Sequence, residues 1–567
     1  MEYQRPTNKK LRCIIVGAGV SGILMAIKLK EIFADKVEFW IFEKNEEVGG
    51  TWFENRYPGK FDVAQKHYSS SAEIRSYLKA ITFHYGIDRY LSLRSPVTSA
   101  VWNEVDSKWT VSVQNQGEFD CEVLVNACGI LNSIQYPQIK GLDLFKGPLL
   151  HTAAWEDNID LGGKRIAVIG AGASAIQMLP VIAKTSERCD VYIRTPSWIT
   201  PPFGTEKPGN FQYTDEEKLR FRDDPEFSLS TRKEMETAFN KLFSAFIQGS
   251  EQQNTLRNAL EKSMRTLVRD PALQEKLIPK FDVGCRRINP GEPYLTSLQS
   301  SNVHPIFDPI DSVTSDGIIA EGQLRAVDVI ITATGFDTSF RPRFSIIGRD
   351  GRDLKDLWKD DPVSYCGLAI SGFPNYLTFL GPNTPISNGS LMGTLEATAE
   401  YFVRLLKKFI NEQAASFDIR EEVQRDFDTH TQDVMKNMVW TGPCRSWYKG
   451  ENGKVRALWP GSSLHYREVL ESNRWEDFSW RYKGNRFAYW GQGFSAVESL
   501  GKTADGDLAY YMKKHQPLPL ETYYLAAKGR VGRATIGASF RPNAGSEVVT
   551  DDESDGSLLE APLFVGI

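Results

Sequence analysis

Residues 145–155 read FKGPLLHTAAW, an F-x-G-x-x-x-H-x-x-x-W segment that stands between two glycine-rich loops. The first loop is GAGVSG at residues 17–22, and the second is GAGASA at residues 170–175. Apolar runs at residues 11–16 and 165–169 lead directly into these loops. A buried strand that ends in such a loop and opens into a helix is the usual dinucleotide-binding unit. The sequence therefore predicts two Rossmann-like domains that the 145–155 segment joins.

The first unit carries the whole dinucleotide pattern. Residues with helical apolar spacing follow its loop, and a second strand at residues 37–42 ends at Glu43. The three glycines allow a tight turn, a close approach to a pyrophosphate and close packing of helix on strand. A carboxylate at Glu43 can accept hydrogen bonds from ribose hydroxyls. The nucleotide-binding residues expected here are Gly17, Gly19, Gly22 and Glu43.

The second unit repeats this pattern but ends its second strand differently. Its loop has Ala175 in place of the third glycine, and its second strand, residues 190–193, is followed by Arg194. A guanidinium suits a ribose 2′-phosphate, whereas an acid would repel it. The first site is therefore predicted to take FAD and the second NADPH. The residues expected at the second site are Gly170, Gly172, Ala173, Ser174, Gln177, Arg194 and Thr195.

The composition is that of a soluble globular protein. The chain has 567 residues, of which 41% are apolar and 25% charged, enough for several domains. Its net charge of −5 offers no basic excess that would attract nucleic acid or an anionic membrane surface. No window of about twenty residues is apolar enough to span a bilayer, and no signal peptide is recognisable. We therefore expect a cytoplasmic protein without a transmembrane segment.

The seven cysteines are scattered along the chain, and their number is odd. None of them forms a C-x-x-C pair. This pattern predicts reduced thiols in a cytosol-like compartment and no structural metal site. The cysteines are Cys13, Cys121, Cys128, Cys189, Cys285, Cys366 and Cys444.

A block rich in glycine and aromatic residues follows Glu43. It reads GGTW at residues 49–52 and NRYPG at residues 55–59, and its aromatic density favours a planar partner or a core over an exposed turn. Residues 214–280 are predicted to be helical, and residues 239–246 place apolar side chains on one helical face. Residues 284–287 then read GCRR, and the spacing alone would equally suit a solvated pair of arginines.

Together these motifs resemble the flavin-dependent Baeyer–Villiger monooxygenases, which are class B flavoprotein monooxygenases, and in particular their fungal secondary-metabolism branch. The resemblance covers about residues 11–500 and includes ATGFD at residues 333–337 and CRSWYK at residues 444–449. It implies an α/β fold with two Rossmann-like domains and a helical insertion. The implied parts are 10–140 and 336–500 for FAD, 141–205 and 284–335 for NADPH, 206–283 for the helical subdomain, and 501–567 for a C-terminal extension whose acidic end is expected to be disordered.

The resemblance also implies an activity. It predicts an enzyme that uses FAD, NADPH and O2 to insert one oxygen atom next to a ketone carbonyl, giving an ester or lactone from a polyketide or terpenoid. By position in the motifs, Arg287 would be the active-site arginine and Asp62 the carboxylate that positions it. The remaining cofactor residues implied are Thr51, Trp52, Asp62 and Tyr68 along the flavin, Arg286 near the 2′-phosphate and Trp447 beside the nicotinamide.

Several alternatives remain open at this point. One is an N- or S-hydroxylating flavoprotein, and another is a plain NADPH:flavin reductase or oxidase. A third is a catalytically impaired homologue, because the segment from Tyr68 to Glu73 is shorter than the aromatic stretch usual in the family. His151 is interpreted as a residue that couples the two domains by hydrogen bonds rather than as a proton donor. Oligomeric state, substrate identity and regiochemistry are not specified by these motifs.

Overall fold

The computed structural model describes residues 10–59, 69–202, 212–491, 493–495, 497–498 and 508–512. Described residues up to 487 belong to one compact unit, and those from 488 onward belong to another, which contains the short 3₁₀ helix η7 (Ala488–Trp490). The account below concerns the first of these units. Among all described residues, the helices are too short or too polar to cross a bilayer.

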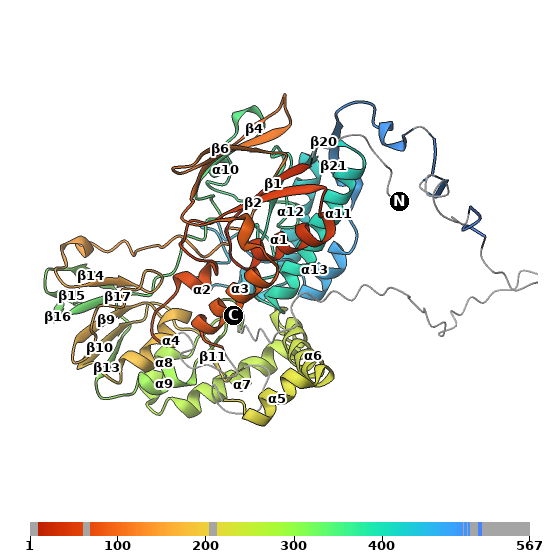
Figure 1. Ribbon diagram of the computed structural model, residues 1–567. Helices are drawn as coiled ribbons and strands as arrows, with labels where there is room; N and C mark the ends of the chain where they lie inside the picture. Colours follow the sequence, from red (N-terminus) through yellow and green to blue (C-terminus); the bar gives the residue numbers. More distant parts are fainter. Residues whose placement is uncertain are drawn as a thin grey trace, which may run out of the picture. The chain divides into compact units, whose positions relative to one another are not determined.

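The first parallel sheet combines four strands from the first 126 residues, among them β1 and β2 (Figure 1), with one strand from much later in the chain. Its strand order is β19-β7-β1-β2-β3, and every neighbouring pair is parallel. The strands are β1 (Leu11–Val16), β2 (Val37–Phe42), β3 (Leu91–Ser92), β7 (Val123–Asn126) and β19 (Tyr376–Thr378). The associated helices are α1 (Val20–Phe33), α2 (Thr51–Glu54), α3 (Ser71–His84) and α11 (Leu391–Asn411). The runs predicted at residues 11–16 and 37–42 are confirmed as strands.

The second parallel sheet has the order β13-β10-β9-β17-β8. Its strands are β8 (Leu149–His151), β9 (Arg165–Ile169), β10 (Arg188–Tyr192), β13 (Val303–Ile306) and β17 (Val329–Thr332). Helices α4 (Ala173–Ile182) and α9 (Glu292–Ser297) accompany it, with the two-stranded pair β11 (Ile199–Thr200) and β12 (Asn289–Pro290). The two doubly wound parallel sheets confirm the predicted fold class. The strands of a parallel sheet are continuous apolar runs, which are buried when helices or other layers cover both faces of the sheet.

Antiparallel sheets complete the β structure. The larger one contains β4 (Val97–Asn103), β5 (Lys108–Val113), β6 (Gly117–Cys121) and β18 (Ser345–Ile347), which pairs parallel to β4. The smaller ones are β14 (Ile310–Val313), β15 (Gly317–Ala320) and β16 (Gln323–Ala326), and the pair β20 (Ala414–Ile419) and β21 (Phe478–Tyr482). Side chains alternate between buried and less buried positions along β5, as expected when one face of a strand meets a core.

The predicted helical insertion is present between the second sheet's two halves. It contains α5 (Asp215–Asp223), α6 (Pro225–Lys241), α7 (Glu251–Leu267) and α8 (Pro271–Leu277). The expected single helical face at residues 239–246 is wrong, because α6 ends at Lys241 and the chain continues as the 3₁₀ helix η3 (Leu242–Phe246). Phe246 is nevertheless buried. The remaining helices are α10 (Leu354–Leu357), α12 (Glu421–Met435), α13 (Ser463–Leu470), η1 (Asp88–Tyr90), η2 (Leu142–Leu144), η4 (Arg349–Gly351), η5 (Val439–Thr441) and η6 (Trp475–Asp477).

Separate hydrophobic cores support the two parallel sheets. Ile14 of β1 and Leu124 of β7 belong to one cluster, which also holds Trp109 of the antiparallel sheet. Ile166 of β9 belongs to a second cluster, which extends into helices α4 and α7. Each sheet can therefore hold its own ligand site on a rigid support.

Candidate active site

The two glycine turns occupy equivalent places in the two sheets. Gly17 has φ +106°, and a Cβ there would lie 2.7 Å from the carbonyl oxygen of Ala127, just after β7. Gly170 has φ +122°, and a Cβ there would lie 2.5 Å from the carbonyl oxygen of Ala333, just after β17. In both sheets the turn thus lies where strand order reverses, which is the edge at which doubly wound folds bind ligands.

The first turn fits a dinucleotide such as FAD. Helix α1 begins after Gly19 without a side-chain cap, so the N–H groups of its first turn can donate to phosphate oxygens. Glu43 follows β2 and accepts hydrogen bonds from the backbone N–H groups of Ala18 (2.7 Å) and Asn45 (2.9 Å). Burial raises the pKa of Glu43, and the two N–H groups oppose this shift. Each carboxylate oxygen keeps a lone pair for a ribose hydroxyl.

The GGTW segment packs directly on this first turn. The Gly49 N–H donates to the Ala18 carbonyl (3.0 Å), and a Cβ on Gly50 would lie 3.1 Å from the Cα atom of Gly19. Thr51 and Trp52 begin helix α2, where the Trp52 side chain is buried and Thr51 is exposed. The predicted flavin-binding residues of both loops are therefore neighbours in space.

A pocket opens at the carboxyl ends of β7 and β19, and its lining includes Cys128, Arg343 and Phe379. Burial raises the pKa of Cys128 to about 12, so its side chain is a neutral thiol at physiological pH. The pocket adjoins Ala127, which the Gly17 turn contacts. Its position on the ligand-binding edge of the first sheet suits a flavin, and Arg343 was not anticipated from the sequence.

The second turn also fits a dinucleotide. Helix α4 has Gly172 as its N-cap without a side-chain cap, and a Cβ at Gly172 would meet nothing within 4 Å. Ala173 is exposed, and Ser174 and Gln177 are half-buried on the first turns of this helix. The uncapped N–H groups and the open space above Gly172 suit a pyrophosphate.

The NRYPG segment connects the two turns. Tyr57 is buried, and its hydroxyl donates a 2.7 Å hydrogen bond to the side-chain oxygen of Gln177. Gly59 has φ +80°, and a Cβ there would lie 2.2 Å from the Gln177 carbonyl oxygen. A loop of the first dinucleotide unit is thereby held against the helix that opens the second.

Arg194, Thr195 and Arg286 lie together beyond the carboxyl end of β10. The Arg286 guanidinium donates to the carbonyl oxygens of Thr195 (3.2 Å) and Pro196 (3.4 Å). Burial lowers the pKa of Arg286, and the neighbouring charge of Arg194 lowers it further. Two guanidinium groups side by side at this place are the donor set that a phosphate monoester requires.

Arg287 is half-buried next to Tyr448. Burial raises the pKa of Tyr448, and the positive charge of Arg287 is the strongest influence that opposes this shift. Within the described part of the chain, Arg287 forms no ion pair with a carboxylate. The two remaining predicted site residues, Asp62 and Tyr68, lie outside the described residues, so the pairing of Asp62 with Arg287 stays a prediction.

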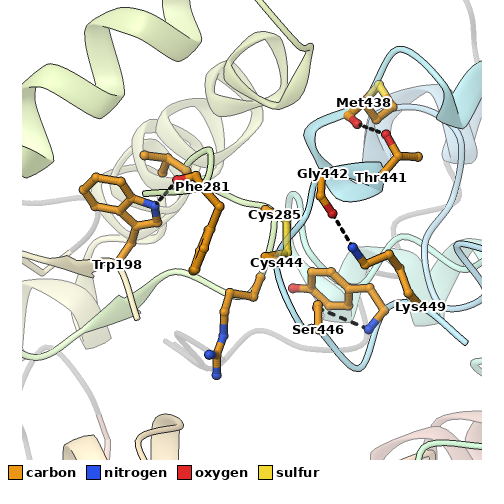
Figure 2. Close-up of a disulfide and its surroundings, with 12 residues drawn as sticks. Trp198, Phe281, Cys285, Met438, Thr441, Gly442, Cys444, Ser446 and Lys449 are labelled. Atoms are coloured by element: carbon orange, nitrogen blue, oxygen red, sulfur yellow. Dashed lines mark hydrogen bonds between the residues drawn. A yellow bond between two sulfur atoms is a disulfide. The ribbon is translucent and has the colours of Figure 1, made fainter. Parts of the chain in front are cut away.

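The helical insertion and the second sheet hold the arginine-bearing loop. The side chain of Gln253, on α7, both donates to the Val283 carbonyl (2.9 Å) and accepts from the Val283 N–H (3.2 Å). The Trp198 indole donates to the Phe281 carbonyl at 3.0 Å (Figure 2). Gln253 is only 2% exposed, so its side-chain amide provides the hydrogen-bond partners that the buried N–H and carbonyl groups of Val283 need.

A disulfide links this loop to the segment that carries Trp447. Figure 2 shows the bond between Cys285 and Cys444, whose Cα atoms are 6.1 Å apart. The prediction that all cysteines are reduced is therefore wrong for this pair, while the other five are free thiols. The pair escaped notice because the two residues are 159 positions apart, and only the tertiary fold brings them together. In the sequence, Cys285 directly precedes Arg286 and Cys444 lies three residues before Trp447, so both cysteines belong to predicted cofactor-binding segments; this was the one signal that they could lie close together.

Trp447 lies in an apolar cluster around the disulfide loop. Its ring centroid is 4.9 Å from that of Tyr448, which is fully buried. Half-buried apolar side chains from four other parts of the chain pack on the same cluster; they are Leu242, Phe243, Ile288, Phe340 and Ile386. The fold therefore places an apolar surface next to Arg287.

His151 ends strand β8 and is completely buried. Its Nδ1 atom accepts a hydrogen bond from the Ala153 N–H (3.0 Å), and its ring packs against Tyr136 (5.3 Å) and Phe336 (6.4 Å). Burial lowers the pKa of His151 to about 4, so the imidazole is neutral at physiological pH. Aromatic packing thus connects His151 to the segments that contain Tyr136 and Phe336, and a hydrogen bond with the Gly335 backbone opposes the effect of burial on its pKa.

Comparison with known proteins gives the family. Residues 58–208 match a model described as flavin-binding monooxygenase-like, and residues 15–81 match an NAD(P)-binding Rossmann-like domain. An FAD-binding monooxygenase of Emericella nidulans, stcW, is 39% identical over 534 residues, which cover 89% of each chain. A Baeyer–Villiger monooxygenase of Pseudomonas aeruginosa is 32% identical over 474 residues, covering 80% of this chain and 88% of that protein.

A solved structure agrees with these relatives. The crystal structure of OTEMO in complex with FAD and NADP has a TM-score of 0.73 and 26% sequence identity, and the match covers 83% of this chain and all of that one. The predicted enzyme class is confirmed, since sequence relatives and fold point to the same chemistry. The chain belongs to the flavin-binding monooxygenase family, and its relatives within that family include Baeyer–Villiger monooxygenases.

Proposed function

We propose that this enzyme uses NADPH and O2 to insert one oxygen atom next to the carbonyl group of a bulky ketone, giving an ester or lactone. When bound, FAD supplies the activation of oxygen and NADPH supplies the hydride. Both dinucleotide turns of this chain fit such cofactors, because each combines an uncapped helix N-terminus with a glycine that leaves room for phosphates. The OTEMO structure, which this fold resembles, was solved with FAD and NADP.

One observation carries the proposal: Arg286 and Arg287 are adjacent in the chain, but their side chains contact different parts of the protein. Arg286 is bonded to the Thr195 and Pro196 carbonyls of the second dinucleotide unit. Arg287 lies beside buried Tyr448 and the apolar cluster that contains Trp447. A permanent positive charge there would stabilise the negative charge that develops while oxygen is transferred to a carbonyl.

The apolar cluster supports a bulky, mainly hydrophobic ketone as substrate. Phe243, Ile288, Phe340 and Ile386 are half-buried against the same apolar cluster as Trp447, and they come from separate chain segments. Such side chains would orient an apolar substrate and keep water away from the reacting atoms. A polyketide or terpenoid ketone of secondary metabolism fits this chemistry, and a fungal protein is among the relatives.

The first prediction tests Arg287 by product analysis. Arg287→Ala should retain NADPH-driven reduction of the flavin but lose ester formation from a panel of cyclic ketones by at least about a hundredfold, because it removes the charge that stabilises the transition state. Chromatography of products and spectroscopy of flavin reduction measure the two steps separately. Arg425→Ala, which removes an exposed arginine on α12, is the matched control and should behave like wild type.

Other outcomes would redirect the assignment. Undiminished ester formation by Arg287→Ala would remove that residue from the mechanism. Hydrogen peroxide as the only product of wild-type turnover with every ketone would indicate a reductase or oxidase. Oxygenation of amines or sulfides in place of ketones would indicate an N- or S-hydroxylating enzyme.

A further inference from the structure

Arg445 follows Cys444 directly, just as Arg286 follows Cys285. The disulfide between the two cysteines therefore brings the backbone that precedes each arginine together, with Cα atoms of the bridged residues 6.1 Å apart. Arg286 in turn is hydrogen-bonded to the carbonyl oxygens of Thr195 and Pro196, which follow Arg194 in the chain. Arg194, Arg286 and Arg445 thus come from three separate segments that the fold joins near the end of β10.

The electrostatics of these groups agree with this geometry. After burial, the strongest influence that lowers the pKa of Arg194 is the charge of Arg445. After burial, the strongest influence that lowers the pKa of Arg286 is the charge of Arg194. Among the residues that the structure describes, none of the three arginines forms an ion pair with an acid. Like charges repel one another, so a bound anion would lower the electrostatic energy of these three arginines.

We propose that Arg445 is a third ligand of the NADPH 2′-phosphate, and that the Cys285–Cys444 disulfide holds it in place. This inference rests on the proposed use of NADPH. A phosphate monoester carries close to two negative charges at neutral pH, and it has enough oxygen atoms for several guanidinium groups. The uncapped N-terminus of α4 suits the pyrophosphate, so the arginine cluster is left for the 2′-phosphate.

The disulfide matters because Arg445 itself is exposed. Its segment also holds local contacts, for example the Lys449 ammonium, which donates to the Gly442 carbonyl (Figure 2), and its Tyr448 packs in the apolar cluster that contains Trp447. The loop of Arg286, in contrast, is fixed by Gln253 and Trp198. The disulfide is the covalent connection between this fixed loop and the residue that precedes Arg445.

Reduction of the disulfide would release Arg445. A thiol reductant such as glutathione supplies two electrons and two protons, the S–S bond breaks into two thiols, and the reductant leaves as its own disulfide. NADPH affinity would then depend on the redox state of this pair, whereas NADH affinity would not.

The experiment compares binding of NADP⁺, NAD⁺ and adenosine 2′,5′-bisphosphate by titration calorimetry. Arg445→Gln should weaken NADP⁺ and bisphosphate binding about tenfold and leave NAD⁺ binding unchanged. Arg445→Lys should recover part of the loss, because it restores the charge without the planar fork. Arg425→Gln, on exposed α12, is the matched charge control and should bind all three ligands like wild type.

The role of the disulfide is tested in the same assay. The double variant Cys285→Ser with Cys444→Ser, and wild type treated with dithiothreitol, should both lose the same factor for NADP⁺. Adding Arg445→Gln to the double variant should cause little further loss, since the two changes remove one interaction. Inorganic phosphate as competitor should weaken NADP⁺ binding less in Arg445→Gln than in wild type.

The outcomes separate this inference from the function on which it rests. A wild-type protein that binds NAD⁺ as tightly as NADP⁺ would contradict the proposed NADPH preference itself. Wild-type preference that survives in Arg445→Gln would overturn only the role of Arg445. Equal losses for NADP⁺ and NAD⁺ in Arg445→Gln would show a structural role instead of a phosphate contact. Full affinity in the double serine variant would overturn the role of the disulfide.

Discussion

At the scale of single residues, burial decides the chemistry of His151. The side chain has no exposed surface, and burial holds its pKa at about 4, against about 6.5 in an unfolded chain. The same residue type in the same motif could act as a proton donor if it were solvated. Its aromatic neighbours Tyr136 and Phe336 instead exclude water, so a neutral packing role follows.

The lowered pKa of His151 gives a pH prediction. Between about pH 6.5 and pH 4 the unfolded imidazole takes up a proton that the folded one does not, so stability is lost as the pH falls. The loss should reach about 1–3 kcal/mol. His151→Asn, which keeps a hydrogen-bond acceptor, should show a smaller fall in melting temperature between pH 7 and pH 5. Identical pH profiles for the two proteins would contradict a depressed pKa.

At the scale of elements, the turn from β9 to α4 separates two roles of glycine. Gly170 needs its positive φ and touches the Ala333 carbonyl, so it serves the fold. Gly172 has φ −90° and open space at its Cβ position, so no requirement of the fold selects glycine there. The remaining reason is a ligand that approaches the backbone closely.

These two glycines make a matched pair of variants. Gly170→Ala should destabilise the protein by roughly 2–4 kcal/mol, because it combines a strained φ with a contact to a backbone oxygen. Gly172→Ala should leave stability within about 0.5 kcal/mol of wild type but weaken NADP⁺ binding about tenfold or more. Thermal unfolding and titration calorimetry measure the two effects. Unchanged NADP⁺ affinity in Gly172→Ala would contradict the proposed position of the pyrophosphate.

At the scale of the whole molecule, the chain leaves the first sheet, builds the second and then returns. Strand β19 joins the first sheet although it follows β17 of the second in sequence. Each sheet has its own core, so local losses of packing can act on one cofactor site more than on the other. The disulfide and the Tyr57–Gln177 hydrogen bond are two of the specific links between segments of the two dinucleotide units and their neighbours.

Two core variants test this division. Ile14→Ala in β1 and Ile166→Ala in β9 each remove a fully buried side chain and should cost about 2–5 kcal/mol. We expect Ile14→Ala to lower the temperature of flavin release, followed by fluorescence, more than Ile166→Ala does. The reverse order is expected for NADP⁺ affinity. Equal effects of both variants on both readouts would show that the sheets unfold as one cooperative body.

Much of the fold was accessible from local patterns. The strands at residues 11–16, 37–42 and 165–169 agree with the structure to the residue, because each is an apolar run that ends at a glycine or a charged residue. The pattern at residues 239–246 misled, because helical spacing continues past the point where α6 ends. The cysteines misled for another reason, since pairing depends on neighbours in space.

The sequence by itself determined two dinucleotide turns, the opposite charges of Glu43 and Arg194 after their second strands, and membership in a monooxygenase family. These features are local, since a turn and the residue after a strand depend on a few consecutive side chains. Only the tertiary structure decided that Cys285 meets Cys444, that Arg445 lies near Arg194, and that Tyr57 bonds to Gln177. Such contacts arise from loops far apart in the chain, and no periodicity or spacing within one segment encodes them.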